Sequence, residues 1–382
     1  MTRAQPEILI IGGGIAGASA AAELARTHRV LLLEGEDAPG YHSTGRSAAV
    51  FSESYGNQAV RALTRASRDF FHSPSAEFSP FPLIKRRGWL HVASLAQASA
   101  LESFLAMEDV APRVRRTSTE EALALSPLLR PETAAAGGAY EEDAGDIDVH
   151  ALHQGYLRLL RRYGTMLTGA HVTAVARTGK KWTVESTAGS FQAPVVINAA
   201  GAWADRIAML AGVAPKRIQA CRRTAVLLEL AGDEMSDAWP LTIDIEEAYY
   251  FKPDAGLLLI SPADETPIEP CDVQPEEIDV ATAIDRVERA TLAAIKRVRR
   301  SWAGLRTFAP DRSPVIGFDD GAPGFFWLAG QGGYGIQTAP AVSALAAALV
   351  RAEAAPPALA SFDPATVSPV RFAKPRQSRG SH

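Results

Sequence analysis

Apolar and glycine-rich segments alternate at the start of the chain. Residues 7–11 and 30–34 are continuous apolar runs that predict buried strands, and residues 18–26 between them form an alanine-rich stretch that predicts a helix. The runs lack the apolar–polar alternation of a half-exposed sheet, so they predict a parallel, helix-covered sheet. The N-terminus is therefore expected to be a βαβ unit.

Later patterns predict a second region that interrupts the first. Short strands and a helix are expected between residues 78 and 140, and the first region returns with a helix at 149–163. Further strands are predicted at 88–92, 171–176, 182–186, 195–199, 224–230, 248–252 and 257–261, and further helices at 95–107, 281–298 and from residue 339.

Composition narrows the class of protein. A chain of 382 residues with 47% hydrophobic and 21% charged residues is typical of a globular protein with two structural units. A net charge of −4 with scattered basic residues gives no electrostatic footprint for nucleic acid. Cys221 and Cys271 lack metal-site spacing, so we expect no metal and reduced thiols in a cytoplasmic protein. No run is long enough to span a membrane, which leaves peripheral contact with the inner membrane face open.

The glycine turn between the first strand and helix reads Gly12-x-Gly14-x-x-Gly17. Such glycines permit a tight turn, close approach of the backbone to a pyrophosphate, and close helix–strand packing. Glu34 ends the second strand, where an acidic side chain accepts ribose hydroxyls. A glycine turn in an ordinary parallel sheet is the alternative, but the strands, the helix and Glu34 together favour nucleotide binding.

Four further segments follow in order along the chain, at residues 34–49, 195–203, 304–311 and 327–338. Together they resemble the D-amino-acid oxidase and glycine oxidase superfamily of FAD-dependent oxidoreductases. Four motifs give a closer likeness, namely Gly40-Tyr-His-Ser-Thr-Gly-Arg-Ser47, Ala151-Leu-His-Gln-Gly-Tyr156, Lys252-Pro-Asp-Ala-Gly256 and residues 331–338. Through them the chain is most similar, within the superfamily, to bacterial FAD-dependent D-arginine dehydrogenases.

The resemblance implies an α/β (α+β) fold with a Rossmann-like FAD-binding domain. A discontinuous second domain, built on a mixed, largely antiparallel sheet, is expected to bind the substrate. The expected bounds are 1–77, 141–215 and 300–368 for the FAD-binding domain, 78–140 and 216–299 for the substrate-binding domain, and 369–382 for a disordered tail.

The resemblance also implies where FAD is held, with Val172 meeting the adenine through its backbone. Some relatives, the sarcosine oxidases, attach flavin through a cysteine, but residues 307–311 contain none, so FAD is expected to be non-covalent. The implied cofactor-binding residues are Gly12, Gly14, Ala16, Gly17, Glu34, His42, Ser43, Thr44, Gly45, Arg46, Ser47, Ala48, Ala49, Val172, Gly201, Gly332, Gly333, Tyr334, Gly335, Ile336 and Gln337.

The implied reaction is oxidative deamination of a D-amino acid. Hydride passes from the α-carbon to flavin N5, and the imino acid is hydrolysed to a 2-oxo acid and ammonia. An arginine suits the substrate carboxylate because its planar guanidinium matches two oxygens. Arg306 and Arg223 fall where the resembled enzymes place theirs. Tyr250 is expected to donate to the same carboxylate, and Tyr55 resembles a mobile lid tyrosine.

Some assignments stay open at this point. Arg222 is an alternative to Arg223, and strand alternation lets either Tyr249 or Tyr250 face the site. His42 and His153 are not assigned to proton transfer, because histidines in a phosphate loop or helix are more often structural.

The expected substrate preference depends on the positions at which this chain differs from the arginine-preferring enzymes. The arginine-preferring enzymes carry an acid and a histidine where this chain has Trp89 and Val50. We therefore expect a pocket formed by Val50, Trp89, Gly333 and Gln337 that prefers apolar side chains or a broad range. Glu53 is a candidate for a compensating charge.

The electron acceptor is expected to be a quinone or another carrier. Sarcosine oxidases carry a lysine where this chain has Leu257-Leu-Leu259. Alternative activities are oxidation of glycine, sarcosine or other secondary amino acids, a D-arginine dehydrogenase proper, or flavin binding without turnover. The sequence predicts no oligomeric state.

Overall fold

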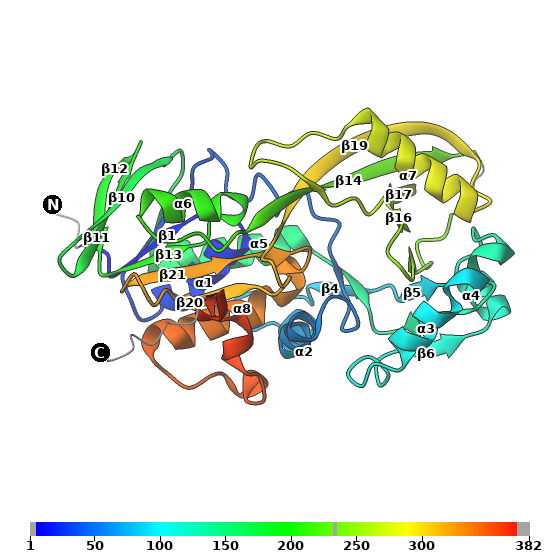
Figure 1. The fold of residues 1–382 in the computed structure, drawn as a ribbon, viewed down its shortest axis with the longest axis horizontal. Coiled ribbons are helices and arrows are strands. Elements are labelled where there is room, and N and C mark those ends of the chain that lie inside the picture. Colours follow the sequence, from blue (N-terminus) through cyan, green and yellow to red (C-terminus); the bar gives the residue numbers. More distant parts are fainter. Residues whose placement is uncertain (1–4, 232–234, 373–382) are drawn as a thin grey trace, which may run out of the picture.

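The computed structural model describes residues 5–231 and 235–372. Two large sheets lie side by side along the long axis. Two long strands of the second sheet, β14 Gln219–Leu230 and β19 Ile295–Phe308, form an arch at its top (Figure 1). The described helices are α1 Ile15–Ala25, α2 Gln58–His72, α3 Ala98–Leu105, α4 Thr119–Leu125, α5 Val149–Tyr163, α6 Ala204–Leu210, α7 Glu277–Ala290 and α8 Gly335–Arg351.

The first sheet is the expected dinucleotide-binding sheet. Its strand order is β20-β21-β13-β1-β2-β9, and all pairs are parallel except β20 with β21. The strands are β1 Ile8–Ile11, β2 Val30–Leu33, β9 Thr165–Leu167, β13 Val195–Asn198, β20 Val315–Phe318 and β21 Phe325–Ala329. The predicted βαβ unit is therefore confirmed.

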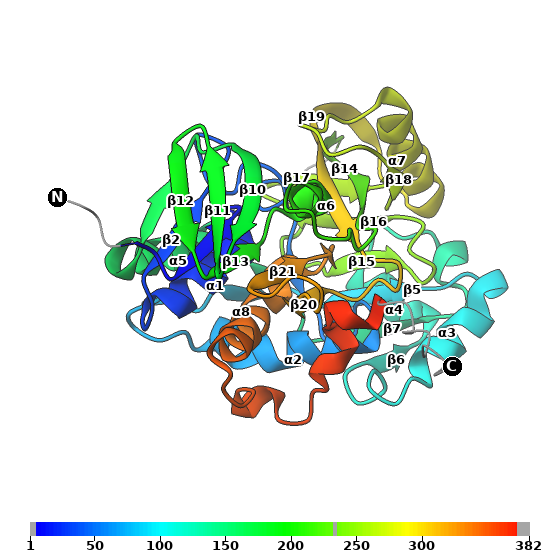
Figure 2. The same cartoon turned by 60° about the vertical axis from the view of Figure 1, so that its left-hand side comes forward.

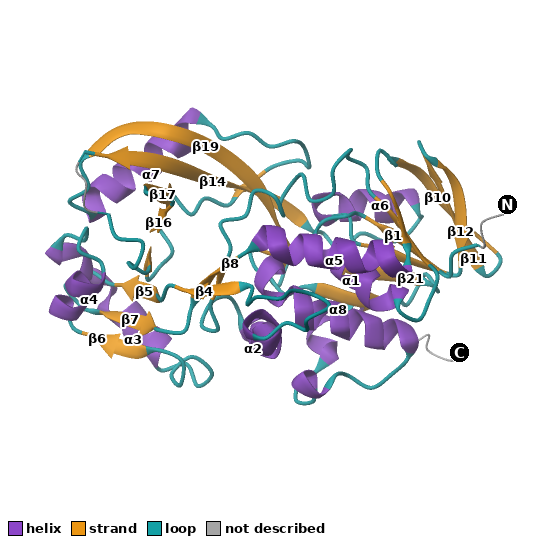
Figure 3. Cartoon of the chain, turned by 180° about the vertical axis from the view of Figure 1, so that it is seen from behind, coloured by secondary structure: helices purple, strands orange, loops and turns teal. Residues whose placement is uncertain are grey.

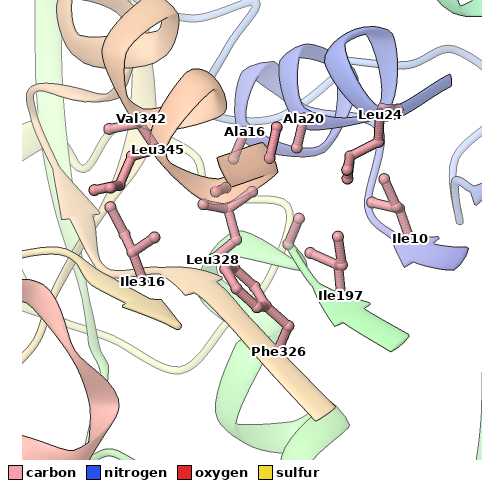
Figure 4. Close-up of a cluster of buried hydrophobic side chains, with 14 of the residues drawn as sticks. Ile10, Ala16, Ala20, Leu24, Ile197, Ile316, Phe326, Leu328, Val342 and Leu345 are labelled. Carbon is pink, nitrogen blue, oxygen red and sulfur yellow. The ribbon is translucent and has the colours of Figure 1, made fainter. Parts of the chain in front are cut away.

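The two faces of this sheet are covered differently. Helices α1, α5 and α8 pack on one face, where Ile10, Ile197 and Phe326 meet Leu24 and Leu345 (Figure 4). The other face is covered by α6 and a small antiparallel sheet, whose strands are β10 Val172–Thr178, β11 Lys181–Ser186 and β12 Gly189–Ala193 (Figure 2). The expectation of a helix-covered sheet is thus correct for one face and incomplete for the other.

The second sheet is mixed and largely antiparallel, as expected. Its order is β22-β19-β14-β17-β16-β15-β5-β7-β6, with β18 beside β14 and one parallel pair, β15 with β5. The strands are β5 Trp89–Val92, β6 Arg115–Thr117, β7 Gly138–Glu141, β14 Gln219–Leu230, β15 Leu241–Asp244, β16 Tyr250–Asp254, β17 Leu257–Ser261, β18 Thr266–Pro267, β19 Ile295–Phe308 and β22 Gln331–Gly332. A short sheet of β3 Val50–Phe51, β8 Gly145–Ile147 and β4 Ile84–Arg86 lies between the two large sheets (Figure 3).

The two faces of the second sheet differ, since one packs in the hydrophobic core and the other carries side chains of the candidate site. One face packs on α7 through Val226, Phe251 and Leu258. The opposite face carries Tyr250 and Trp89 beside Tyr55. Period-2 alternation along each strand therefore decides which side chains reach a ligand.

The predicted helix at 281–298 is wrong in its second half. Helix α7 ends at Ala290, because Thr291 takes an extended backbone (φ −133°, ψ 166°), and residues 295–308 form β19. Pairing with the twelve-residue strand β14 overrides the local pattern of basic residues, which alone suits an exposed helix face.

Other boundaries shift by a turn. Helices α1 and α8 begin at Ile15 and Gly335, earlier than residues 18 and 339, because the glycine loops lead directly into the first helical turn. In the expected tail, Pro369–Phe372 forms a short 3₁₀ turn, and residues 373–382 lie outside the described residues. The division into two domains stays a prediction; its boundary at residue 300 falls within β19.

Candidate functional site

The nucleotide loop is built so that only glycine fits at its tightest points. Gly12 has φ +106°, and a Cβ there would lie 2.4 Å from the carbonyl oxygen of Ala199. A Cβ on Gly17 would lie 1.8 Å from the carbonyl oxygen of Gly12. Gly17 therefore lets α1 pack against the loop, as the sequence predicts.

The start of α1 is held in place by polar contacts. The Gly13 N–H donates to Glu34 Oε2 at 2.6 Å, and the Ile15 N–H donates to Thr44 Oγ1 at 3.0 Å. His153 Nε2 lies 2.9 Å from the Gly13 carbonyl oxygen, behind the loop. This placement agrees with leaving His153 out of proton transfer.

A cavity of about 390 Å³ runs from this loop towards the second sheet. Sixteen of the predicted cofactor residues line it, namely Gly12, Gly14, Ala16, Glu34, His42, Ser43, Thr44, Arg46, Ser47, Ala48, Val172, Gly201, Gly332, Gly333, Gly335 and Ile336. The guanidinium of Arg46 is already committed to the carboxylate of Asp272 and the carbonyl oxygen of Val273.

Five predicted cofactor residues do not line this cavity. Gly17 packs against Gly12, and Gly45 forms a turn in which a Cβ would lie 2.7 Å from the carbonyl oxygen of Gly40. Tyr334 packs edge-on against Tyr55, with ring centroids 4.9 Å apart. The other two, Ala49 and Gln337, line a second cavity instead.

The sequence reasoning missed several residues of the large cavity. His171 precedes the predicted Val172, and Trp203 ends the quoted segment 195–203. The His42 ring lies 4.6 Å from that of Trp203, and both line the cavity. Trp203 carried a signal in its motif, whereas nothing in the pattern marks His171.

A second cavity of about 60 Å³ adjoins the first and shares Ser47, Ala48, Arg306, Gly333 and Ile336 with it. Its other lining residues are mostly apolar or aromatic, namely Ala49, Val50, Tyr55, Trp89, Leu241, Ile243, Tyr250 and Gln337. Both amide atoms of Gln337 are engaged, since Oε1 accepts from the Ser52 N–H and Nε2 donates to Thr64.

Arg306 stands where the two cavities meet. Its Nη1 donates to the Tyr55 hydroxyl at 3.2 Å. Within residues 5–231 and 235–372, no carboxylate lies within 4 Å of its guanidinium. Burial works against the charge, but the hydroxyls of Tyr55 and Tyr250 outweigh it and raise the pKa of Arg306. The side chain therefore offers a permanent, incompletely paired positive charge to both cavities.

The structure places Arg223, rather than Arg222, at the large cavity. Arg223 donates to the carbonyl oxygen of Asp264 at 2.7 Å and to Glu265 Oε1 at 3.1 Å. Arg222 lies on the other face and pairs with Glu276 and, at 2.7 Å, with Asp279. Because Arg223 has a carboxylate partner, it is a weaker anion site than Arg306.

Strand alternation likewise places Tyr250 at the second cavity. Tyr249 belongs to the opposite face, against α7. Val50 and Trp89 line the second cavity as predicted. Glu53 does not line it, because its carboxylate pairs with Arg68 at 2.5 Å and with Arg113 at 3.3 Å.

Tyr55 packs between neighbouring aromatic rings in this structure. Its side chain is 9% exposed and its ring lies 5.0 Å from that of Trp89. Burial raises the pKa of its hydroxyl, against the opposing effect of Arg306. The hydroxyl therefore stays protonated and able to donate a hydrogen bond.

The residues of the large cavity fit a dinucleotide. Its lining combines Glu34 and Val172, glycine backbone at the start of α1, and Arg306 with Gly333. The close packing at Gly12 and Gly17 lets the backbone of the loop approach the position at which such folds bind a pyrophosphate. Fold and cavity thus define a dinucleotide-binding protein with an adjoining small-ligand pocket.

Comparison with known proteins identifies the family. The model of the DAO family, described as FAD dependent oxidoreductase, matches residues 7–349, and the chain belongs to this family. It is therefore an FAD-dependent oxidoreductase. The large cavity is the candidate site for FAD and is named the FAD cavity.

Individual relatives are distant. FAD-dependent oxidoreductase domain-containing protein 1 of Bos taurus is 25% identical over 392 residues, covering 90% of this chain and 81% of that protein. Mitochondrial dimethylglycine dehydrogenase of Homo sapiens is 25% identical, covering 86% of this chain and 40% of that protein. The crystal structure of glycine oxidase from Geobacillus kaustophilus has a TM-score of 0.82 at 20% identity, covering 97% of this chain and all of that chain.

Two kinds of feature are absent from the described part of the chain. No helix there combines the length and apolarity needed to cross a membrane. No group of three or more histidine, cysteine, aspartate or glutamate side chains there is arranged to hold a metal ion.

Proposed function

We propose that the chain oxidises an amino acid at its α-carbon, as an FAD-dependent D-amino acid dehydrogenase. The substrate would lose a hydride and a proton, and water would hydrolyse the imino acid to a 2-oxo acid and ammonia. When bound, FAD supplies the acceptor for the two electrons.

One observation carries the proposal: the guanidinium of Arg306, which has no carboxylate partner among the described residues, faces both the FAD cavity and the second cavity. A buried cation without such a partner is unfavourable unless a ligand anion completes it. A substrate carboxylate does so with two parallel hydrogen bonds. Its α-carbon would then lie at the boundary between the cavities.

The tyrosines complete the carboxylate site in this proposal. The Tyr55 hydroxyl already touches Arg306, and Tyr250 lines the same cavity. Both can donate to the oxygens that Arg306 leaves free. Holding the carboxylate at several points fixes the α-carbon, which lowers the entropic part of the barrier. Arg223 would add a second positive charge, partly neutralised by Glu265, to the wall of the large cavity.

The side-chain preference rests on the walls of the second cavity. Val50, Trp89, Leu241 and Ile243 present apolar surface there, and Glu53 is bound by Arg68 and Arg113. A cationic side chain would find no carboxylate among the described lining residues. We therefore propose an apolar D-amino acid, although the face of Trp89 could attract a cation by roughly 0.5–2 kcal/mol.

A second candidate is oxidation of glycine or of an N-methylated or cyclic amino acid. Two observations favour it, the second cavity of only about 60 Å³ and the name of one relative, dimethylglycine dehydrogenase. Such substrates need little room for a side chain. A D-arginine dehydrogenase proper is disfavoured by the apolar walls.

For the electron acceptor we propose a quinone or another carrier rather than oxygen. Residues 257–259 offer no lysine, and Lys252, the strand partner of Leu259, pairs with Asp146 at 2.7 Å. The positive charge of Lys252 is therefore neutralised locally and does not line either cavity.

The test is a comparison of kcat/KM for D-phenylalanine, D-leucine, D-methionine, D-arginine, glycine, sarcosine and L-proline, each with oxygen and with a soluble quinone. The proposal expects the apolar D-amino acids and the quinone to lead. A hundredfold lead of D-arginine, about 2.7 kcal/mol, would mean that an acid reaches the pocket. A lead of sarcosine or L-proline would favour the second candidate. Trp89→Phe is the matched variant for the role of Trp89 in substrate preference, since it keeps an aromatic side chain in the wall of the second cavity.

A further inference from the structure

Glu141, at the end of β7, is a buried acid that the proposed reaction does not use. Its side chain lies beside the second cavity without lining it, and the residue is 3% exposed. Among the described residues no lysine or arginine nitrogen lies within 4 Å of its carboxylate. A buried carboxylate without a cation is unfavourable unless hydrogen bonds satisfy it.

Four hydrogen bonds from one short segment do satisfy it. Glu141 Oε2 accepts from the hydroxyls of Ser52 and Ser54, each at 2.6 Å, and from the Ser54 N–H at 3.2 Å. Glu141 Oε1 accepts from the Glu53 N–H at 2.7 Å. Burial raises the pKa of Glu141, and these hydrogen bonds oppose the rise. Both carboxylate oxygens of Glu141 therefore accept hydrogen bonds from residues 52–54.

This segment leads directly into Tyr55, the tyrosine that touches Arg306. Glu141 is also the strand partner of Trp89 across β5 and β7, and Trp89 packs against the ring of Tyr55. The Glu141 carboxylate therefore binds the backbone segment that precedes Tyr55. Glu141 itself lies on the strand beside Trp89, whose ring packs against Tyr55. The segment makes further contacts, from the Ser52 N–H to Gln337 and from Glu53 to Arg68.

We propose that Glu141 is a positioning residue, whose carboxylate holds residues 52–54 so that the Tyr55 hydroxyl stays against Arg306 and completes the site for the substrate carboxylate. Tyr55 is then a fixed wall of the pocket rather than a mobile lid. The inference rests on the proposed function, because it assigns Tyr55 and Arg306 to one substrate group.

Glu141→Gln is the informative change. It keeps the size of the side chain, but an amide has one accepting oxygen where the carboxylate has two. The amide NH2 would face either the Glu53 N–H or the Ser54 N–H, neither of which can accept from it, although the hydroxyls of Ser52 and Ser54 could rotate to accept. In either orientation one backbone N–H loses its acceptor. The segment must then shift. Ser54→Ala is a milder second variant that removes a single hydroxyl donor and serves if Glu141→Gln does not fold.

Two readouts separate positioning from simple stability. The first is the dissociation constant of benzoate, an unreactive aromatic carboxylate, from the change it causes in flavin absorbance. The second is the KM of the best amino acid. We expect Glu141→Gln to raise both about tenfold and Ser54→Ala about twofold to threefold, with FAD content unchanged.

A double-mutant cycle that combines Glu141→Gln with Tyr55→Phe tests whether Glu141 acts through Tyr55. If Glu141 acts through Tyr55, the double variant should resemble the more affected single variant rather than multiply the two effects. Asp205→Asn is the matched control: Asp205 is a partly buried carboxylate that accepts from the N–H groups of Lys216 and Ile218, away from the second cavity. It should change stability without changing benzoate binding.

The inference is overturned if Glu141→Gln or, where that variant does not fold, Ser54→Ala binds benzoate as the wild type does. Effects that multiply with Tyr55→Phe, or an equal loss in Asp205→Asn, would also overturn it. Failure of the proposed function looks different, since no amino acid would then bleach the wild-type flavin, while benzoate binding stays measurable.

Discussion

Replacing Arg306 by alanine removes the charge on which the proposed reaction depends. The guanidinium stands where the two cavities meet and has the Tyr55 hydroxyl as its hydrogen-bond partner at 3.2 Å. In Arg306→Ala a substrate carboxylate would enter an apolar and aromatic pocket without a facing cation. Both binding and orientation of the α-carbon should suffer, so KM should rise and kcat should fall.

The size of the effect follows from the kind of interaction that the substitution removes. Truncating one partner of a buried, hydrogen-bonded charge pair weakens binding by about 2–5 kcal/mol. At about 1.4 kcal/mol for each factor of ten, kcat/KM should fall roughly 30- to 4,000-fold. Arg306→Lys keeps the charge but not the two-pronged geometry, so it should recover only part of this activity.

Steady-state kinetics with the best amino acid and a saturating acceptor measure this change. The matched control is Arg300→Ala on the same strand, an exposed arginine whose guanidinium lies over the Trp302 ring. The control should keep wild-type kinetics. If Arg306→Ala retains full FAD and wild-type kcat/KM, Arg306 does not bind the substrate and the proposed function is wrong.

Three further predictions concern the cofactor and stability. Acid precipitation should leave FAD in a yellow supernatant, since neither Cys221 nor Cys271 lines the FAD cavity; colour in the pellet would mean a covalent bond. Gly17→Ala should lose FAD or fail to fold, because its Cβ would lie 1.8 Å from a carbonyl oxygen, whereas Gly179→Ala meets no atom within 4 Å and should keep FAD as measured by absorbance. Burial lowers the pKa of His91 from 6.5 to about 3; the unfolded chain then takes up a proton below about pH 6.5 that the folded chain does not. Stability should therefore fall by up to about 1.4 kcal/mol for each pH unit below that point. Melting temperatures at pH 7 and pH 5 check this, and an equal acid sensitivity in His91→Gln would contradict it.

The nucleotide-binding half was predictable because its signals are local. The apolar runs, the glycine spacing and Glu34 all lie within about thirty residues, and each has one structural meaning in that order. The family resemblance then added the distant loops around His42 and Gly332, most of whose residues line the cavity.

The second sheet was harder because long-range pairing decides it. Residues 295–298 read as helix by composition, yet β19 forms there because β14 offers a partner strand. The choice between Tyr249 and Tyr250, or between Arg222 and Arg223, depended on which face of that sheet meets α7. Glu141 carried no signal, since its partners lie 87 to 89 residues away.

Anaerobic titration of the purified holoprotein with amino acids, followed by flavin absorbance, tests the central claim most directly. The proposed function predicts that an apolar D-amino acid bleaches the flavin, that its L-enantiomer does not, and that a quinone restores the colour. Rapid bleaching by the L-enantiomer would contradict the stereochemical assignment. A flavin that no amino acid, including glycine, sarcosine and proline, can reduce would contradict amino-acid oxidation altogether.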